Sequence, residues 1–293
     1  KVRYVKGCEI LGHEPGEIKA AQKAAKESDL ALVVVGENRR TVGEPCDVFD
    51  LNLTGLQQQL VEAVFASGTP TVVVLINGRA LSVNWIDENI PAIVEAWNCG
   101  EQGGHAVADV LFGDYNPGGK LPVTFPKHSG QLPVYYNYKP AKEFWIDYEG
   151  VEKWAELYVG DQIKPLYEFG YGLSYTEFEY SNLRISPEEI GPAGEVAISA
   201  DVENTGQREG TETVQLYFDD EISSMSTPVK ELRGFEKVSL KPGEKKTVRF
   251  KLTSGQISFL DRNLKPVVEP GVFEVMIGSS SDDIRLKGEF KVR

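Results

Sequence analysis

The chain has 293 residues, of which 41% are hydrophobic, 10% aromatic and 26% charged, a composition typical of a globular protein of about two domains. Its 44 Asp and Glu residues outnumber 31 Lys and Arg residues, which gives a net charge of −13 at pH 7. Because such a surface repels nucleic-acid phosphates and anionic lipid, we expect neither nucleic acid nor a membrane as a partner.

The first segments alternate between helix-like and strand-like patterns. Residues 17–28 carry alanines and an isoleucine on one helical face, and residues 30–35 form an apolar run typical of a strand buried on both faces. Thr54 and Gln57 have the spacing of a capping box, which predicts a helix over 55–66.

The same alternation continues along the first half of the chain. Residues 71–76 and 92–96 are predicted strands, and residues 103–111 are a predicted helix. Strands that alternate with helices indicate βαβ units and a mostly parallel sheet. The first half is therefore predicted to be an α/β domain with a mostly parallel sheet.

An aromatic-rich stretch without a sustained period follows. We predict an α/β domain over residues 1–138, an aromatic-rich linker over 139–172 and a third region over 173–293. The linker is too aromatic to be a flexible spacer. It either packs across a domain surface or presents a ligand-facing aromatic platform, for which Trp145 is the candidate substrate contact.

The last part of the chain consists of short alternating segments separated by turn signals. Seven short strands in about 115 residues suggest an immunoglobulin-like β sandwich. The aromatic side chains of this part fall within strand patterns, which predicts that they fill the core and form no platform for a sugar. The predicted strands cover residues 178–185, 195–203, 212–219, 231–239, 246–252, 272–277 and 284–290.

Several familiar site motifs fail on inspection. The three cysteines cannot pair completely, and the three histidines lack metal-ligand spacing, so no disulfide framework and no metal site are predicted. The glycine-rich residues 113–120 place Gly119 where a phosphate-binding loop requires Lys. We therefore expect no cofactor.

One polar loop is a better candidate site. Residues 36–53 follow a predicted parallel strand, and ligands of open α/β sheets bind beyond the carboxyl ends of the strands. Glu37 and Glu44 both lie on this loop, which makes it a plausible platform for a general acid. A solvated charged loop without a function is the alternative that composition alone allows.

Several long sequence segments, in the same order along the chain, resemble those of a known enzyme family. Residues 97–126 (WNCGEQGGHAVADVLFGDYNPGGKLPVTFP), 165–183 (PLYEFGYGLSYTEFEYSNL) and 231–244 (ELRGFEKVSLKPGE) resemble the carboxyl-terminal half of glycoside hydrolase family 3. The resemblance implies an α/β sandwich domain, here lacking its first elements, followed by a fibronectin type III-like β sandwich.

The resemblance also implies a function. Such enzymes are retaining exo-acting β-glycosidases that remove terminal β-D-glucosyl or β-D-xylosyl residues. Their general acid/base is a Glu on a loop of the α/β domain. The match of Gly43, Glu44 and Asp47 to the family loop makes Glu44 the implied acid/base, with Glu37 as runner-up. Val48 stands where the family loop often has Arg. Asp47 is a candidate substrate contact.

The family nucleophile is an Asp on a (β/α)8 barrel, and no barrel pattern occurs in this chain. We therefore expect the last portion of a larger enzyme, no nucleophile in this chain, and a barrel partner in cis or in trans. A β-linked oligosaccharide or glycoside is the implied substrate, and the family favours a periplasmic or secreted location. A truncated sheet should expose apolar surface, and the assembly of several copies stays open. A non-catalytic carbohydrate-binding or structural module is the alternative.

Overall fold

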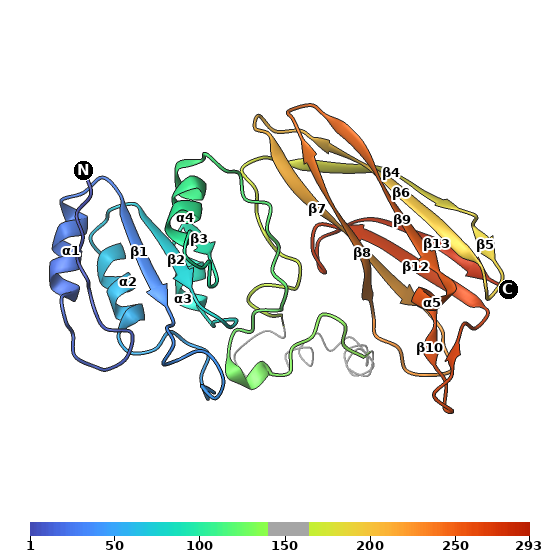
Figure 1. The fold of residues 1–293 in the computed structure, drawn as a ribbon, viewed down its shortest axis with the longest axis horizontal. Helices are drawn as coiled ribbons and strands as arrows, with labels where there is room; N and C mark the ends of the chain where they lie inside the picture. The colour runs from blue at the N-terminus through green and yellow to red at the C-terminus, as the bar shows by residue number, and fades with distance from the viewer. Residues whose placement is uncertain (140–163) are drawn as a thin grey trace, which may run out of the picture. The chain divides into compact units, whose positions relative to one another are not determined.

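The computed structural model describes residues 1–139 and 164–293, which form two compact units (Figure 1). The α/β unit comprises Lys1–Tyr115 and Phe125–Leu132, and the β-sandwich unit comprises Asn116–Thr124 and Pro133–Arg293. Most of the predicted linker, including Trp145, lies outside the described residues. The predicted boundaries at residues 138 and 172 remain predictions.

The α/β unit is built on a three-stranded parallel sheet. Its strands are β1 (Ala31–Gly36), β2 (Thr71–Ile76) and β3 (Ala92–Glu95), in the order β1-β2-β3. The three predicted strands are confirmed. Leu32 and Val34 are nevertheless 46% and 56% exposed, so the prediction that this strand is buried on both faces is wrong. β1 is an outer strand, and the exposed apolar surface expected of the sheet lies here.

Helices α1 and α2 lie together on one side of this sheet (Figure 1). α2 begins at Gln57, its N-cap is Leu56, and no side chain caps it, so the predicted capping box is wrong. The reason is that the side-chain oxygen of Gln57, which a capping box would bond to the Thr54 N–H, accepts the Gly36 N–H at 2.8 Å. The Gln57 amide nitrogen donates to the carbonyl oxygens of Gly36 at 2.8 Å and of Thr54 at 3.1 Å. The helices of the unit are α1 (Ile18–Lys26), α2 (Gln57–Phe65), α3 (Asn84–Asn89), α4 (Gly103–Phe112) and the 3₁₀ turn η1 (Ser129–Gln131).

The second unit is a two-sheet β sandwich, in which all seven predicted strands are confirmed. One sheet has the order β5-β13-β12-β7-β8 and the other the order β4-β6-β9. The bounds are β4 (Phe178–Ser186), β5 (Glu189–Ile190), β6 (Glu195–Asn204), β7 (Gly210–Asp220), β8 (Glu231–Leu240), β9 (Lys245–Thr253), β12 (Gly271–Gly278) and β13 (Ile284–Val292). Shorter elements are α5 (Ser254–Ile257), β10 (Phe259–Leu260) and β11 (Pro266–Val267).

The core of the sandwich lies between the two sheets. Phe218, Phe273 and Phe290 stack in sequence, with ring centroids 5.5 and 5.3 Å apart. Phe273 is fully buried in this core, as its strand position predicts. Tyr217 is also fully buried, but it lies outside this core and packs against Tyr136, with ring centroids 5.8 Å apart. Phe235 is 66% exposed, and its predicted place in the core is wrong.

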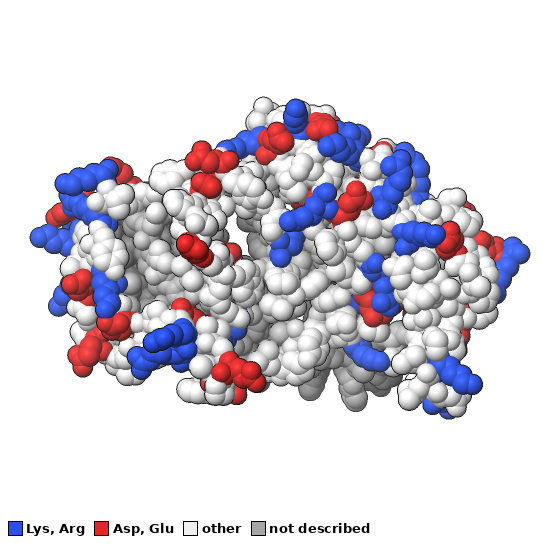
Figure 2. Space-filling view, viewed as in Figure 1, with Lys and Arg blue, Asp and Glu red and all other residues white. Residues whose placement is uncertain are grey.

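On the face shown in Figure 2, acidic and basic side chains are interspersed, and no large surface of one sign is present on that face. In the described part of the chain, no helix is long and apolar enough to cross a membrane.

Candidate functional site

The candidate loop leaves the sheet at the carboxyl end of β1. Gly36 ends this strand with a φ of +139°, and a Cβ built on it would lie 2.0 Å from the carbonyl oxygen of Ile76. Only glycine fits this close approach of the two parallel strands. The next residue, Glu37, donates its N–H to the same oxygen at 2.7 Å, so the first residue of the loop is fixed to the sheet.

The Glu37 side chain is held in an ion pair. Its Oε1 lies 3.0 Å from Nε of Arg79, and its Oε2 accepts the N–H of Gly78 at 3.1 Å. The Glu37 side chain is 4% exposed and that of Arg79 is 21% exposed. A buried carboxylate paired in this way is a structural anchor, because removal of either partner leaves an uncompensated buried charge.

Arg79 also holds the loop further along its course. Its Nη2 donates to the carbonyl oxygen of Thr41 and, at 3.0 Å, to that of Cys46. Between Glu37 and Thr41 the backbone turns, and the Thr41 N–H donates to the carbonyl oxygen of Asn38 at 2.9 Å. One guanidinium therefore contacts the base, the first turn and the far side of the loop.

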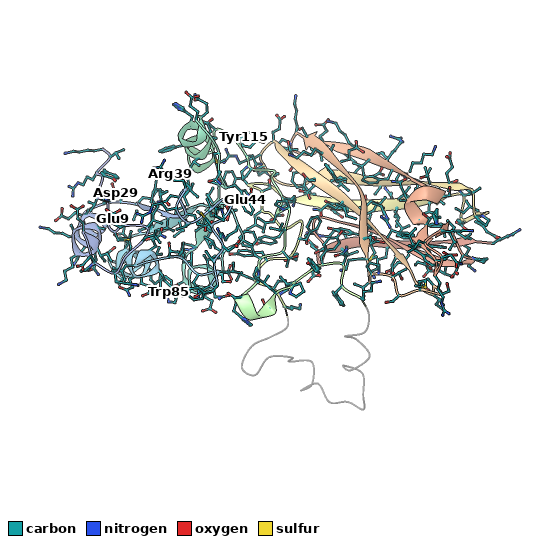
Figure 3. The ribbon with its side chains drawn as sticks, turned by 60° about the horizontal axis from the view of Figure 1, so that its bottom comes forward. Glu9, Asp29, Arg39, Glu44, Trp85 and Tyr115 are labelled. Carbon is teal, nitrogen blue, oxygen red and sulfur yellow. The ribbon has the colours of Figure 1, made fainter. Side chains whose placement is uncertain are left out.

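In the sequence, Glu44 lies between Thr41 and Cys46, the two residues whose carbonyl oxygens Arg79 binds. Its side chain is exposed, and among the described residues its carboxylate has no hydrogen-bond or ion-pair partner. Glu44 and Arg39, both labelled in Figure 3, come from this loop. Asp47 follows on the same loop and is also exposed. The structure thus brings both predicted glutamates and Asp47 to one end of the sheet, while Trp145 lies outside the described residues.

Two further polar residues at this edge of the sheet were missed by sequence reasoning. Asn77 follows β2, and its Nδ2 donates to Glu95 Oε2 at 3.2 Å and to the carbonyl oxygen of Arg79 at 2.8 Å. Glu95 Oε1 accepts the N–H of Trp97 at 2.9 Å. Burial raises the pKa of Glu95 to about 7, although both hydrogen bonds oppose the shift.

A signal for these residues was present in the sequence. Asn77 and Arg79 directly follow one predicted strand, and Glu95 lies near the end of the next. Because the carboxyl ends of parallel strands meet at the same edge, polar residues in these positions are expected near a loop that follows the neighbouring strand. Their contacts connect the ends of all three strands to the loop that carries Glu44.

Chemically, the loop presents two carboxyl groups, of Glu44 and Asp47, that are exposed and have no partner among the described residues, on a backbone that is fixed at several points. Such a group can donate and accept a proton once a substrate lies within about 2.6–3.2 Å of it. The carboxylate of Glu37 is less available for proton transfer to a substrate, because it is buried and already bound to Arg79 and to the Gly78 N–H.

Comparison with known proteins gives two family matches. The model of the glycosyl hydrolase family 3 C-terminal domain matches residues 4–175, and the model of a fibronectin type III-like domain matches residues 212–281. The first match spans nearly all of the α/β unit, and the second lies within the β-sandwich unit.

Full-length relatives match across nearly the whole chain. A β-xylosidase from Formosa agariphila is 45% identical over 97% of this chain, and a periplasmic β-glucosidase from Salmonella typhimurium is 42% identical over 94%. A crystal structure of a β-glucosidase from Listeria innocua in complex with glucose superimposes with a TM-score of 0.90 at 36% identity and over 97% of this chain. The chain spans only 39%, 36% and 39% of these three proteins.

Proposed function

Because this chain belongs to glycoside hydrolase family 3, we propose that it forms the acid/base-bearing part of a retaining exo-acting β-glycosidase. The enzyme removes terminal β-D-glucosyl or β-D-xylosyl residues from a β-linked glycoside or oligosaccharide. The names of the relatives, β-xylosidase and β-glucosidase, support these two sugars. A (β/α)8 barrel, carried in cis or in trans, supplies the nucleophile.

The domain arrangement is part of this proposal. Residues 1–138 carry the acid/base loop, residues 139–172 form a linker, and residues 173–293 form the fibronectin type III-like domain. The two family matches, one ending at residue 175 and one beginning at residue 212, support this order.

Glu44 is the proposed general acid/base. A retaining mechanism needs two carboxyl groups about 5–5.5 Å apart across the scissile bond. One attacks the anomeric carbon, while the other protonates the leaving oxygen and later takes a proton from water. Glu44 performs the second role, and the barrel nucleophile performs the first.

We choose Glu44 because the two glutamates of the loop differ in burial and in pairing. Glu37 is buried and committed to Arg79 and to the Gly78 N–H, whereas Glu44 is exposed and unpaired among the described residues. An acid/base must be free to contact a substrate oxygen and to exchange its proton. Glu37 therefore acts as an anchor of the loop, and Glu44 as the reacting group.

The test uses Glu44→Gln in the complete enzyme, with the barrel present. Loss of the acid lowers the hydrolysis of substrates with poor leaving groups by about 10²–10⁴-fold, because proton transfer contributes that much. Activated aryl glycosides lose less in the first step. Added azide restores turnover and gives a glycosyl azide of retained configuration.

Glu88→Gln is the matched control, since Glu88 is an exposed glutamate of α3 in the same unit. It should leave turnover unchanged. Full activity of Glu44→Gln, together with lost activity but an unchanged melting temperature in Glu37→Gln, would transfer the acid/base role to Glu37.

A further inference from the structure

The β-sandwich unit contains a cleft that sequence reasoning did not foresee. The cleft has a volume of about 500 Å³ and is lined by residues from the segment around Lys120, from residues 168–180 and from the strands β4, β7 and β13. Small-molecule sites of proteins typically have volumes of about 300–1,000 Å³. The cleft is therefore large enough for a small ligand.

A buried carboxylate lies in the wall of this cleft. Glu212 of β7 is only 3% exposed. Its Oε1 accepts the hydroxyl of Tyr180 at 2.8 Å and lies 3.5 Å from Nζ of Lys120. Burial raises the pKa of Glu212, and the nearby Lys120 opposes the shift.

Glu212 contributes a carboxylate to the lining of the cleft, and this carboxylate is held in place by Tyr180 and Lys120. A carboxylate accepts hydrogen bonds only, and a bond to a charged group is stronger than one between neutral groups. A hydroxyl group placed in the cleft could donate to it. Glu212 is therefore an anchor point that a ligand with a hydrogen-bond donor would fill.

The rest of the lining supplies fixed polar groups and aromatic surface. Arg285 binds Asp283 through two bonds of 2.5 and 2.6 Å, and its guanidinium lies over the Tyr180 ring at 5.9 Å. The hydroxyl of Ser280 donates to Glu168 at 2.7 Å. Tyr171 and Phe178 also line the cleft. Side chains held by one another in this way present pre-oriented donors and acceptors next to apolar ring surface.

The charges of the lining restrict the class of ligand. Four carboxylates, of Glu168, Glu177, Glu212 and Asp283, face two cations, of Lys120 and Arg285. This excess of negative charge disfavours phosphates and other anions. No group of three His, Cys, Asp or Glu side chains in the described parts of the chain could hold a metal ion. A neutral ligand with several hydroxyl groups fits both observations.

We propose that this cleft of the β-sandwich unit binds a neutral saccharide of one or two pyranose units. Its hydroxyls donate to Glu212 and Glu168 and accept from Lys120 and Arg285, while an apolar sugar face packs against the aromatic side chains. This role is independent of the acid/base proposal, because none of its residues lies on the Glu44 loop. The site would hold a carbohydrate near the enzyme without hydrolysing it.

The experiment is isothermal titration of the 293-residue chain with glucose, xylose, cellobiose and xylobiose. At least one of these sugars should bind with a stoichiometry of one per chain. Glucose 6-phosphate should bind at least about 10-fold more weakly than glucose, because its phosphate meets the excess of carboxylates. Glu212→Gln should weaken binding by at least about 10-fold, because hydrogen bonds to charged groups are the stronger ones.

Three further variants make the result decisive. Thr205→Trp places a large side chain at the exposed rim of the cleft and should abolish binding without changing the core. Glu274→Gln, on β12 outside the cleft, and Glu88→Gln, on α3 of the α/β unit, should bind sugar as the parent chain does. Each variant is accepted only if its thermal transition matches that of the parent chain. The proposal is overturned if none of the four sugars binds, or if Thr205→Trp binds normally.

Discussion

Arg79 and Glu37 form an ion pair, 3.0 Å from Nε to Oε1, at the base of the loop that carries the candidate acid/base. The same guanidinium binds the carbonyl oxygens of Thr41 and Cys46, on either side of Glu44. The position of Glu44 therefore depends on a residue that follows a different strand, β2, and is separated from it by 35 positions in the sequence.

The first prediction concerns the stability that this ion pair provides. Arg79→Met should destabilise the chain by about 3–5 kcal/mol, because Glu37 would remain buried without its partner. The double variant Glu37→Gln with Arg79→Met should recover part of this loss. Urea unfolding of the single and double variants measures the difference, with Arg39→Met on the same loop as the exposed control. Equal stability of Arg79→Met and Arg39→Met would contradict the anchoring role.

A second prediction separates stability from catalysis on the same loop. Glu44→Gln should change the free energy of unfolding by less than about 0.5 kcal/mol, because Glu44 is exposed and unpaired among the described residues. Glu37→Gln should destabilise the chain clearly. Thermal unfolding of both variants checks this, and a large loss of stability in Glu44→Gln would show that the Glu44 carboxylate makes a stabilising contact in the folded chain.

The third prediction concerns the pH dependence of stability. Burial raises the pKa of Glu95 from 4.5 to about 7, so the folded state binds its proton more tightly than the unfolded state does. Its contribution to stability is therefore complete below about pH 4.5 and declines as the pH rises through 7. Glu95→Gln removes this dependence, and comparison with the parent chain cancels the other titrating groups.

The measurement is the difference in melting temperature between the parent chain and Glu95→Gln from pH 5.5 to 8.5. The parent chain should lose stability relative to the variant up to about pH 7.5, beyond which the difference should level off. A difference that is constant with pH would show that the carboxyl of Glu95 ionises as it does in water.

The fourth prediction concerns activity. The isolated chain should not measurably hydrolyse 4-nitrophenyl β-glucoside or β-xyloside, because proton donation contributes only about 10²–10⁴-fold of a much larger acceleration. Addition of a separately expressed barrel should restore turnover. Substantial hydrolysis by the chain alone would overturn the proposed division of the two carboxyl groups between this chain and the barrel.

Much of the fold could be predicted from the sequence. Strands such as β13 alternate outward and inward residues, and β1 and β2 of the parallel sheet are short apolar runs, so the local pattern was sufficient to find these strands. The predicted capping box was wrong because the Gln57 side chain is hydrogen-bonded to the backbone of Gly36, 21 positions away, and local spacing does not reveal such a contact. The predicted burial of Phe235 was wrong because alternation alone does not show which face of β8 is covered by the other sheet.

The candidate site was predictable only in part. The loop and both glutamates were found, since they follow a recognisable strand. The sequence did not reveal which glutamate is paired, because that depends on Arg79, whose approach is set by the register of two parallel strands. The cleft at Glu212 was missed for a similar reason. Its lining comes from segments up to 165 positions apart.

Because the chain passes between the two units more than once, recombination cannot exchange the β-sandwich unit as one continuous segment. The chain passes from the α/β unit to the β-sandwich unit at residue 116, returns at 125 and leaves again at 133. Lys120 and its neighbours thus belong to the sandwich although they precede the end of the α/β unit. A recombination event with one breakpoint between residues 133 and 175 would give the recipient a sandwich without Lys120, and would leave Glu212 without its cation. Gene fusions that exchange this sandwich should therefore succeed only when the donor brings residues 116–124 as well.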